Sequence, residues 1–482
     1  MSRNNASVTD GKFEEDGVRD EGTKRATRLM SAAVAPPWRL SLLLPAIFVF
    51  LSCWLLLFCS TATHKPISQL SDDLYRKLSA ASEEAESCRG GPWVYVYDLP
   101  PEFNAGLLHD CRHLNMHRDM CPHVANRGLG QALPRAPPGS PSSSSWFSTN
   151  QFTAEMIFHA RAEKHPCRTR DPEKAAIFYA PFYGGLYASS KFRERNLTAR
   201  DALATRFVEY LGEQPWWRRR QGHDHFLVLG RTAWDFMRGA PGEADYGASS
   251  LLTLPRIRNM TTLVLERHPA AGPAQQGIPY PSYFHPSRSE EMLRWQQHVK
   301  RTRRPHLFAF VGAPRAGQER NPARAESIRQ CNASRQCQLL LCGGKRRQCG
   351  DPTEVVGAMA ESRFCLQPAG DSSTRRSTFD AILAGCIPVY FSRQAAETQY
   401  GWFLPAEAEA YSVRMDAREK RIEEELRRIP AARERRMRGV LVDLIPTVTY
   451  AHPNATRLRF PDAVDVALDA VSRHVHSNLG AI

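Results

Sequence analysis

The hydrophobic positions beyond residue 92 form short apolar runs that alternate with segments of helical period. Runs that are apolar on both faces are typical of parallel strands buried between helices, and their alternation with helices indicates βαβ units. A helix over 287–305 separates two series of such units. The pattern predicts strands over 93–100, 175–183, 225–230, 261–266, 306–312, 338–342, 363–368 and 386–391, and further helices over 150–165, 204–213, 377–384 and 461–474.

The longest apolar run lies near the start of the chain, at residues 40–59, and contains no charge. Twenty such residues are about the length that crosses a bilayer, whereas a cleaved signal peptide has a shorter apolar region nearer the start. A buried core helix is the other alternative, but it is rarely apolar on every face. Basic residues before the span, among them Arg28 and Arg39, place the N-terminus in the cytosol. We therefore expect one transmembrane helix, membrane attachment through it, and a single-pass type II protein.

The apolar span at 40–59 separates an N-terminal tail from the rest of the chain. Residues 1–39 are polar and predict a disordered cytosolic tail, and residues 60–91 predict a stem. The following α/β sequence divides into an N-terminal domain over 92–285, a linker helix over 286–305 and a C-terminal domain over 306–482. We expect two α/β domains that meet across a cleft.

The formal net charge of +14 raises the question of nucleic-acid binding. The basic clusters are scattered, and the one at 419–430 is interleaved with acids, as on a solvated helix face. We therefore expect no nucleic-acid partner.

The cysteines and the glycosylation triplets agree with a lumenal domain. Ten of the twelve cysteines follow the apolar span, on the side where disulfides form. Cys111 with Cys121 and Cys342 with Cys349 are close enough to pair locally, although spacing alone leaves the connectivity open. Four Asn-x-Ser/Thr triplets follow the span and predict a glycoprotein, with acceptors at Asn196, Asn259, Asn332 and Asn454.

Residues 363–391 carry the strongest chemical pattern. A strand leads through a hydroxyl-rich loop into a short helix, and Gly385 suits the position just after the helix end. The helix N-terminus directs N–H groups at the loop, where Arg375 and Arg376 add two guanidinium groups suited to phosphate. A diphosphate is the predicted ligand. The alternative is a capped helix in which Asp380 reaches back to its N-terminus, with the arginines solvated or paired with Asp371.

The same stretch, "FCLQPAGDSSTRRSTFDAILAGCIPVYF", resembles the signature of the exostosin-type glycosyltransferases, most closely the plant xyloglucan galactosyltransferases. The likeness extends over roughly residues 92–478 and includes "VYVYDLPPEFN", "NQFTAEMIFHAR", "GHDHFLVLGRTAWDF", "GIPYPSYFHP" and "FAFVGAPR". It implies the GT-B fold, with two Rossmann-like domains facing a cleft. It also implies inverting transfer of galactose from UDP-galactose to xylosyl side chains of xyloglucan, in the Golgi, during cell-wall synthesis.

The resemblance assigns the donor site to the C-terminal domain. It implies that Arg315, Arg375 and Arg376 hold the diphosphate, that Thr374 and Ser377 belong to the same donor-binding loop, and that Asp380 binds the ribose. No Asp-x-Asp metal motif occurs in the chain, so arginines and the helix dipole are expected to replace a metal in stabilising the departing UDP. We expect a metal-independent enzyme without a cofactor, with the UDP-sugar as co-substrate.

Inverting transfer needs a base that deprotonates the acceptor hydroxyl, and we expect it from the N-terminal domain. Four residues in family-like blocks are candidates, and the sequence leaves the choice open: Glu155, Asp224, His225 and Asp235. Each can equally be structural, and the His-Asp-His triplet at 223–225 lacks a third partner for a metal site. Sugar rings stack on aromatic side chains, which makes Tyr183, Tyr187, Trp234, Tyr280 and Tyr283 the candidate acceptor-binding residues.

Other functions remain open at this point. The same fold could use another UDP-sugar, such as UDP-galacturonic acid, or another wall polysaccharide. A non-catalytic lumenal carbohydrate-binding or partner subunit is the alternative from another class. Complexes with other Golgi glycosyltransferases are a further expectation.

Overall fold

The computed structural model describes residues 88, 91–140, 143–239, 247–314, 322–343, 348–395 and 398–480. The predicted tail, the apolar span at 40–59, the stem up to residue 87 and Arg315 lie outside the described residues. Within these ranges, no helix has the length and apolar character that would span a membrane. All described residues belong to one compact unit, Ala80–Ile482.

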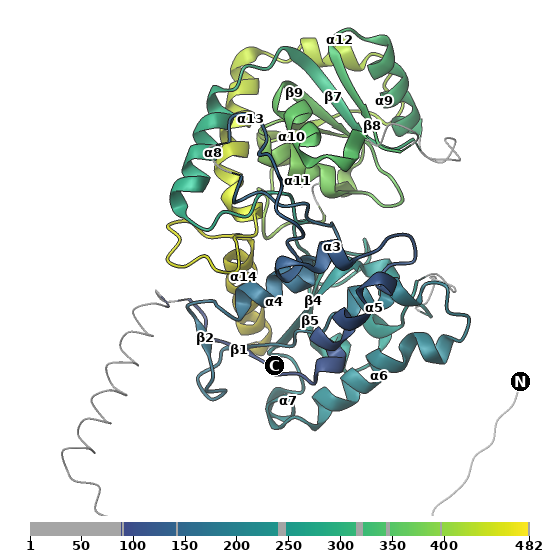
Figure 1. The fold of residues 1–482 in the computed structure, drawn as a ribbon, viewed down its shortest axis with the longest axis vertical. Helices are drawn as coiled ribbons and strands as arrows, with labels where there is room; N and C mark the ends of the chain where they lie inside the picture. The colour runs from purple at the N-terminus through teal and green to yellow at the C-terminus, as the bar shows by residue number, and fades with distance from the viewer. Residues whose placement is uncertain are drawn as a thin grey trace, which may run out of the picture. The chain divides into compact units, whose positions relative to one another are not determined.

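The first half of this unit is built on a six-stranded parallel sheet in the order β2-β1-β3-β4-β5-β6 (Figure 1). The central strands β4 and β5 are almost completely buried, which explains their continuous apolar sequence. The strands are β1 Val94–Val96, β2 Arg168–Thr169, β3 Ile177–Tyr179, β4 His225–Thr232, β5 Thr261–Glu266 and β6 Gln275–Gly277. The helices are α3 Cys121–Val124, α4 Ala154–Ala162, α5 Gly184–Lys191, α6 Leu197–Glu213 and α7 Pro215–Arg220.

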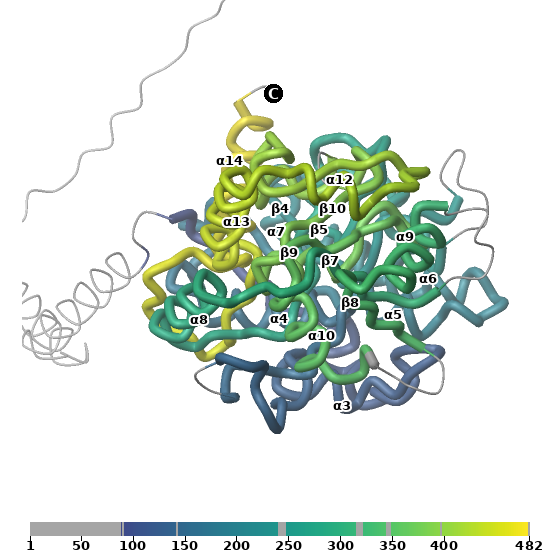
Figure 2. The backbone as a smooth tube through the Cα atoms, turned by 90° about the horizontal axis from the view of Figure 1, so that it is seen from above, coloured from purple at the N-terminus to yellow at the C-terminus, as the bar shows by residue number. Residues whose placement is uncertain are grey.

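The second half is built on a five-stranded parallel sheet in the order β11-β10-β9-β7-β8. Figures 1 and 2 both show α8, which precedes this sheet, beside α13. The strands are β7 His306–Gly312, β8 Cys337–Leu341, β9 Ser362–Gln367, β10 Ile387–Tyr390 and β11 Val413–Arg414. The helices are α8 Ser289–Arg301, α9 Pro322–Ala333, α10 Pro352–Ala360, α11 Arg376–Leu383, α12 Ile422–Arg427, α13 Ala431–Leu444 and α14 Ala463–Leu479.

The predicted α/β class with parallel sheets is confirmed. The strands at 261–266 and 306–312 have the predicted bounds. Gly385 ends α11 with φ of +66°, and the amide groups of Gly385 and Cys386 donate to the carbonyls of Ile382 and Ala381. This pair of bonds is the glycine-dependent helix end that the sequence predicts. Helices α3, α5, α7, α9, α10 and α13 were not predicted.

Aromatic side chains connect the cores of the two sheets. The ring of Trp146 lies 4.9 Å from those of Phe284 and Trp295, centre to centre. The indole N–H of Trp295, in α8, donates to the carbonyl of Leu383 in α11 at 2.9 Å. These buried contacts fix α11 against the segment that leaves the first sheet.

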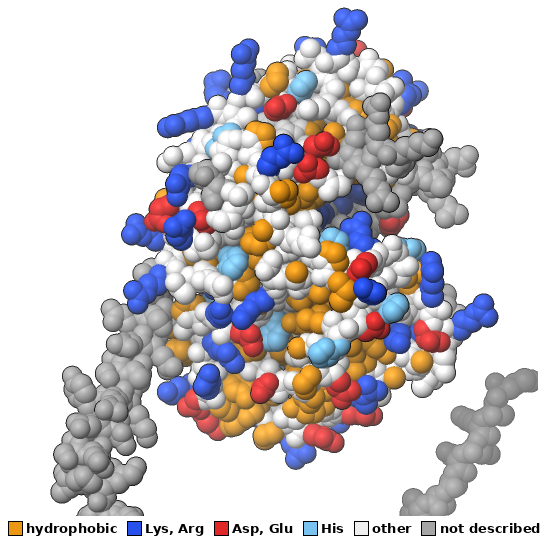
Figure 3. All heavy atoms as spheres, viewed as in Figure 1, with side chains coloured by type: hydrophobic (Ala, Val, Ile, Leu, Met, Phe, Trp, Pro, Cys, Tyr) orange, Lys and Arg blue, Asp and Glu red, His pale blue; other side chains and the backbone are white. Residues whose placement is uncertain are grey.

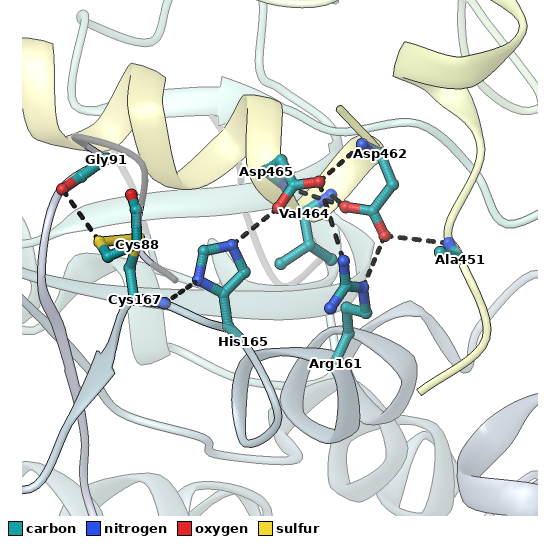
Figure 4. A network of polar contacts seen from close by, with 9 residues as sticks. All are labelled: Cys88, Gly91, Arg161, His165, Cys167, Ala451, Asp462, Val464 and Asp465. Carbon is teal, nitrogen blue, oxygen red and sulfur yellow. Dashed lines mark hydrogen bonds and ion pairs between the residues drawn. A yellow bond between two sulfur atoms is a disulfide. The ribbon is translucent and has the colours of Figure 1, made fainter. Parts of the chain in front are cut away.

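The last described helix returns to the first sheet. Helix α14 packs against α4 and β3, and Figure 4 shows the polar network at this contact. Arg161 of α4 donates through Nε to Oδ2 of Asp462 at 2.9 Å, and Nε2 of His165 lies 2.7 Å from Oδ1 of Asp465. Asp462 also caps α14 by accepting from the amides of Val464 and Asp465. The C-terminal helix is therefore part of the first half of the unit.

All ten cysteines after the apolar span form disulfides. The two local pairings that the spacing allows, Cys111–Cys121 and Cys342–Cys349, are present. The remaining disulfides are Cys88–Cys167, Cys331–Cys337 and Cys365–Cys386. The last one joins β9 to the residue before β10, so it closes the chain segment that contains α11.

The described surface in Figure 3 carries Lys and Arg side chains that are interspersed with Asp and Glu. This face shows no continuous basic stripe, and its charge distribution is that of an ordinary solvated surface.

Candidate active site

A cavity of about 490 Å³ lies where the carboxyl ends of β4 and β5 meet the loop that follows β9. In open α/β sheets this edge is where ligands bind, because the loops that leave the strands diverge there. The first half contributes Gln151, Phe152, Arg231, Thr232, Trp234, Asp235, Glu266 and Tyr280, and the loop contributes Asp371, Ser372, Thr374, Arg375 and Arg376. We call residues 370–376 the donor loop.

Arg376, the first residue of α11, is held from three sides. Its Nη1 donates to the carbonyl of Thr149 at 2.6 Å, and its Nε lies 3.4 Å from Oδ2 of Asp380. The guanidinium carbon lies 3.7 Å from the ring centre of Tyr283. Nη2 is buried and has no hydrogen-bond partner among the described residues. The guanidinium group is thus fixed at the cavity wall with a donor available for an anion.

Asp380 lies behind Arg376 and does not line the cavity. Its Oδ1 accepts from the hydroxyl of Ser282 at 2.5 Å, and burial raises the pKa of this carboxyl while Arg376 opposes the rise. Ser377 also points away, since its hydroxyl donates to Oε1 of Gln367 at 2.5 Å. Arg375 is the N-cap residue of α11, and no side-chain hydrogen bond caps the helix there. The alternative in which Asp380 caps the N-terminus of its own helix is therefore wrong.

Arg375 and Thr374 both line the cavity. A Cβ added at Gly370 would overlap Nη2 of Arg375, so the glycine leaves space for this guanidinium group. The amide of Thr374 donates across to Oε2 of Glu266 in the first half at 3.4 Å. The donor loop is therefore in direct contact with the end of β5.

The carboxyl end of β4 supplies an arginine and a carboxylate. Nε of Arg231 donates to Oδ2 of Asp235 at 2.6 Å, and its Nη1 donates to the hydroxyl of Ser189 at 2.8 Å. The guanidinium group lies over the rings of Phe152 and Phe192 at 4.5 and 4.8 Å. Of the four candidate bases, Asp235 is the one that lines the cavity.

The other three candidate bases do not line the cavity. Glu155 is fully buried, and its carboxylate accepts from the backbone N–H groups of Gly185, Leu186 and Gly230 at 2.8–2.9 Å. Burial raises the pKa of Glu155 to about 7, against the effect of these bonds. Asp224 and His225 stand at the amino end of β4, roughly 20 Å from Arg231 at about 3.3 Å per residue. None of these three residues lines the cavity, and their polar atoms serve internal contacts.

Of the five candidate acceptor-binding aromatic residues, two line the cavity and three do not. Trp234 and Tyr280 line the cavity. Tyr183 is buried with its hydroxyl 2.9 Å from Nδ1 of His159, and the hydroxyl of Tyr187 donates to the carbonyl of Ala199 at 2.8 Å. Tyr283 supports Arg376 with its ring and does not line the cavity.

Glu266, the last residue of β5, is a site residue that the sequence analysis missed. Its side chain is fully buried in the protein yet lines the cavity, and its Oε1 accepts from the hydroxyl of Tyr280 at 2.6 Å. Burial raises the pKa of Glu266 to about 7, although hydrogen bonds from Tyr280, Ser372 and Thr374 and the charge of Arg375 oppose the rise. The available signal was an acidic residue that ends an apolar strand, "TTLVLE", where ligands are expected.

Among the described residues, no group of three or more His, Cys, Asp or Glu side chains is placed to hold a metal ion.

The predicted glycosylation acceptors Asn196, Asn332 and Asn454 are exposed, whereas Asn259 is half-buried. The amide of Asn259 donates to the carbonyl of Gln221 at 2.9 Å.

Comparison with known proteins places this site in a family. The model of the Exostosin GT47 domain matches residues 88–432. From Arabidopsis thaliana, "Probable xyloglucan galactosyltransferase GT17" is 57% identical over 387 residues, which cover 80% of this chain and 83% of that protein. "Xyloglucan galactosyltransferase MUR3" is 40% identical, over 82% of this chain and 64% of that protein, and "Xyloglucan galactosyltransferase XLT2" is 41% identical, over 80% and 75%.

Among solved structures, the "Crystal structure of GtfA/B complex" aligns with a TM-score of 0.30 and 11% identity, over 57% of this chain and 60% of that one. The family match covers most of the chain and includes both sheets and the cavity between them. The chain therefore belongs to the exostosin GT47 family of glycosyltransferases.

Proposed function

We propose that this protein is an inverting β-galactosyltransferase that moves galactose from UDP-galactose to xylosyl side chains of xyloglucan. The observation that carries the proposal is the cavity, where Arg375 and Arg376 of the donor loop face Arg231, Trp234 and Glu266 of the first half. The 57% identity to a protein named as a probable xyloglucan galactosyltransferase supports the choice of sugar and acceptor.

The donor loop is suited to the diphosphate of UDP. The N-terminus of α11 presents N–H groups and the positive end of the helix dipole, and two guanidinium groups lie beside it. The anomeric C–O bond breaks with its electrons passing to the β-phosphate oxygen, and these cationic groups stabilise that charge. The proposal includes catalysis without a metal or other cofactor. Asp380 contributes by holding Arg376 in place from behind.

The acceptor sugar would occupy the side of the cavity formed by the first half. Trp234 and Tyr280 present aromatic surface there, on which the C–H faces of a sugar ring can pack. Two parallel sheets that face a shared cavity with the carboxyl ends of their strands support the GT-B arrangement. The donor would bind to the second half and the acceptor to the first.

The proposal also includes a Golgi location with the catalytic unit in the lumen and residues 40–59 as the membrane anchor. Five disulfides that join all ten lumenal cysteines support an oxidising compartment. Association with other Golgi glycosyltransferases would follow from a shared polysaccharide acceptor.

The test is transfer by the full-length protein, purified in detergent, with xyloglucan oligosaccharides and a panel of UDP-sugars. We expect galactose transfer from UDP-galactose, with the product identified by mass spectrometry and glycosidase digestion, and undiminished activity in chelator. Preference for UDP-galacturonic acid would refute the proposed donor. A folded protein without turnover on any donor would support a carbohydrate-binding or partner subunit, and complete loss in chelator would refute metal independence.

A further inference from the structure

We propose that Glu266 is the general base that takes the proton from the acceptor hydroxyl during sugar transfer. This inference rests on the proposed function and names a residue for the step that it left open. Three observations support it: where Glu266 lies, which of its oxygen atoms can accept a proton, and how the neighbouring carboxylates differ from it.

Glu266 stands at the boundary between the two halves of the site. It ends β5 of the first sheet, and its Oε2 lies 3.4 Å from the amide nitrogen of Thr374 in the donor loop. A sugar attached to a diphosphate at Arg375 and Arg376 would lie beside this loop, inside the cavity that Glu266 lines. An acceptor hydroxyl that approaches from Trp234 and Tyr280 would meet the carboxylate and the anomeric carbon together.

The hydrogen bonds of Glu266 orient the carboxylate and leave room for a proton. Tyr280 donates to Oε1 at 2.6 Å, whereas Oε2 accepts the longer bond from the Thr374 amide. The hydroxyl of Ser372 is a third hydrogen-bond partner, and since a carboxylate has about four lone-pair sites, one remains for the acceptor hydroxyl. Because burial raises the pKa of Glu266 to about 7, the group is partly ionised at neutral pH and binds a proton readily.

The charged and titratable groups near Glu266 belong to the donor loop, to two tyrosines and to the cavity wall. Arg375 lowers its pKa from the donor loop, while Tyr280 and Tyr400 pack against it without charge, since burial raises the pKa of both phenols. The other ionisable groups that line the same cavity are Arg231, Asp235, Asp371 and Arg376. A bound diphosphate would add negative charge and raise the affinity of Glu266 for a proton further.

The other carboxylates are less suited to this step. The Oδ2 atom of Asp235 is already bonded to Nε of Arg231 at 2.6 Å and to the hydroxyl of Thr232 at 3.3 Å, and Asp235 makes no described contact with the donor loop. Asp371 is exposed and belongs to the loop that holds the donor. Glu155 has the same raised pKa as Glu266, but three backbone N–H groups bind its oxygens and it does not line the cavity.

The step balances without another reactant. The acceptor oxygen forms a bond to the anomeric carbon while the bond from that carbon to the β-phosphate oxygen breaks. The electron pair of the broken bond leaves with UDP beside Arg375 and Arg376. The hydroxyl proton passes to Oε2 of Glu266 and is released to water after the products depart.

The test compares Glu266→Gln with the wild type. We expect kcat to fall at least about 100-fold, as for loss of a general base, with the Kd for UDP within threefold of the wild-type value. In the wild type, kcat/KM should fall as pH decreases below about 7, because protonation removes the base, and this fall should be absent from the residual activity of the variant. Glu266→Asp, which keeps a carboxylate, should recover part of the rate.

Glu155→Gln is the matched control, since it neutralises a buried carboxyl of the same pKa that lies off the cavity. It should lower the unfolding midpoint and retain the pH dependence of the wild type. If Glu266→Gln retains that pH dependence, or loses UDP affinity by the same factor as kcat, Glu266 is a positioning residue for the donor loop and the inference is overturned. A wild type that uses a different UDP-sugar refutes the proposed donor only, and the comparison is then made with that sugar. Inactivity of the folded wild type on every donor overturns both proposals.

Discussion

The two ends of β4 both carry charged side chains, and the carboxyl end lines the cavity of the candidate active site. At the amino end, Nδ1 of His225 lies 2.7 Å from Oδ1 of Asp224 and its Nε2 lies 2.8 Å from the hydroxyl of Tyr97. Arg219 donates to the other oxygen of Asp224 at 3.2 Å. At the carboxyl end, Arg231 and Asp235 bond to each other and also line the cavity.

The difference shows that residue type does not identify a site in this fold. Both ends contain an acid beside a cation, and the amino end also contains the histidine that general-base chemistry often uses. The ring of Phe178 stacks on His225 at 4.8 Å and that of Trp217 packs edge-on at 5.1 Å, so aromatic side chains close the amino end. The direction of the parallel strands, rather than the chemistry of the side chains, indicates at which end a ligand is expected.

The largest change in free energy, a loss of folding stability, is expected from Asp224→Ala at the amino end of β4. The substitution leaves His225 and Arg219 without their buried carboxylate, which should lower the free energy of unfolding by about 3 kcal/mol. The transfer rate per folded molecule should stay near that of the wild type. Denaturant unfolding together with initial rates checks both expectations. A stable but inactive variant would show that the amino end of β4 takes part in catalysis, and would contradict the structural role given to this end.

At the opposite edge, Arg375→Ala should affect ligand binding and leave stability nearly unchanged, because Arg375 is partly exposed at the cavity wall. Loss of charged hydrogen bonds worth about 1.5–3 kcal/mol raises the Kd for UDP by about 10- to 100-fold. Calorimetric titration with UDP measures it. Arg375→Lys should raise the Kd for UDP by a smaller factor. Arg301→Ala, which changes an exposed arginine of α8, should leave the Kd unchanged.

Arg376→Ala is a less specific probe of the anion site than Arg375→Ala. Arg376 is the cation beside Asp380, which is fully buried, so its removal would leave that carboxylate uncompensated and destabilise α11 as well. An unchanged affinity for UDP in Arg375→Ala would show that the donor loop is not the anion site.

A smaller effect is expected from Gly370→Ala. The added Cβ would overlap Nη2 of Arg375, and the flexible end of that side chain would move rather than the backbone. We expect the Kd for UDP to rise by about 3- to 10-fold, corresponding to at most about 1.4 kcal/mol. Gly357→Ala in α10, where nothing lies within 4 Å of the added Cβ, is the control and should stabilise the helix without changing the Kd. Equal Kd values in the two variants would contradict the role of Gly370.

Local sequence patterns correctly predicted those elements whose pattern fits a single type of secondary structure. The strands 261–266 and 306–312 are continuous apolar runs, and Gly385 is the only glycine beside the helix that it ends. Helix α13 was missed because arginines at 433, 435, 436 and 438 dilute its apolar face. Helix α10 was missed because a short apolar helix and a buried strand share the same composition.

The donor loop was predictable because strand, loop and helix are contiguous in the sequence. Glu266 was not, since it meets Thr374 across 108 residues. That contact depends on how the two sheets pack, which no local pattern encodes. The same limit applies to the internal contacts of Glu155, because its three backbone partners come from α5 and β4.

The contact of α14 with α4 determines the order in which this protein can be completed during synthesis. Arg161 finds Asp462 only after 301 further residues have been translated, and until then α4 and β3 lack their cover. The first sheet, although it is made early, must therefore wait for the last helix, with apolar surface exposed to the chaperones of the compartment. A nascent chain that stops before residue 463 would contain every residue of the donor loop but would lack the helix that covers the first sheet.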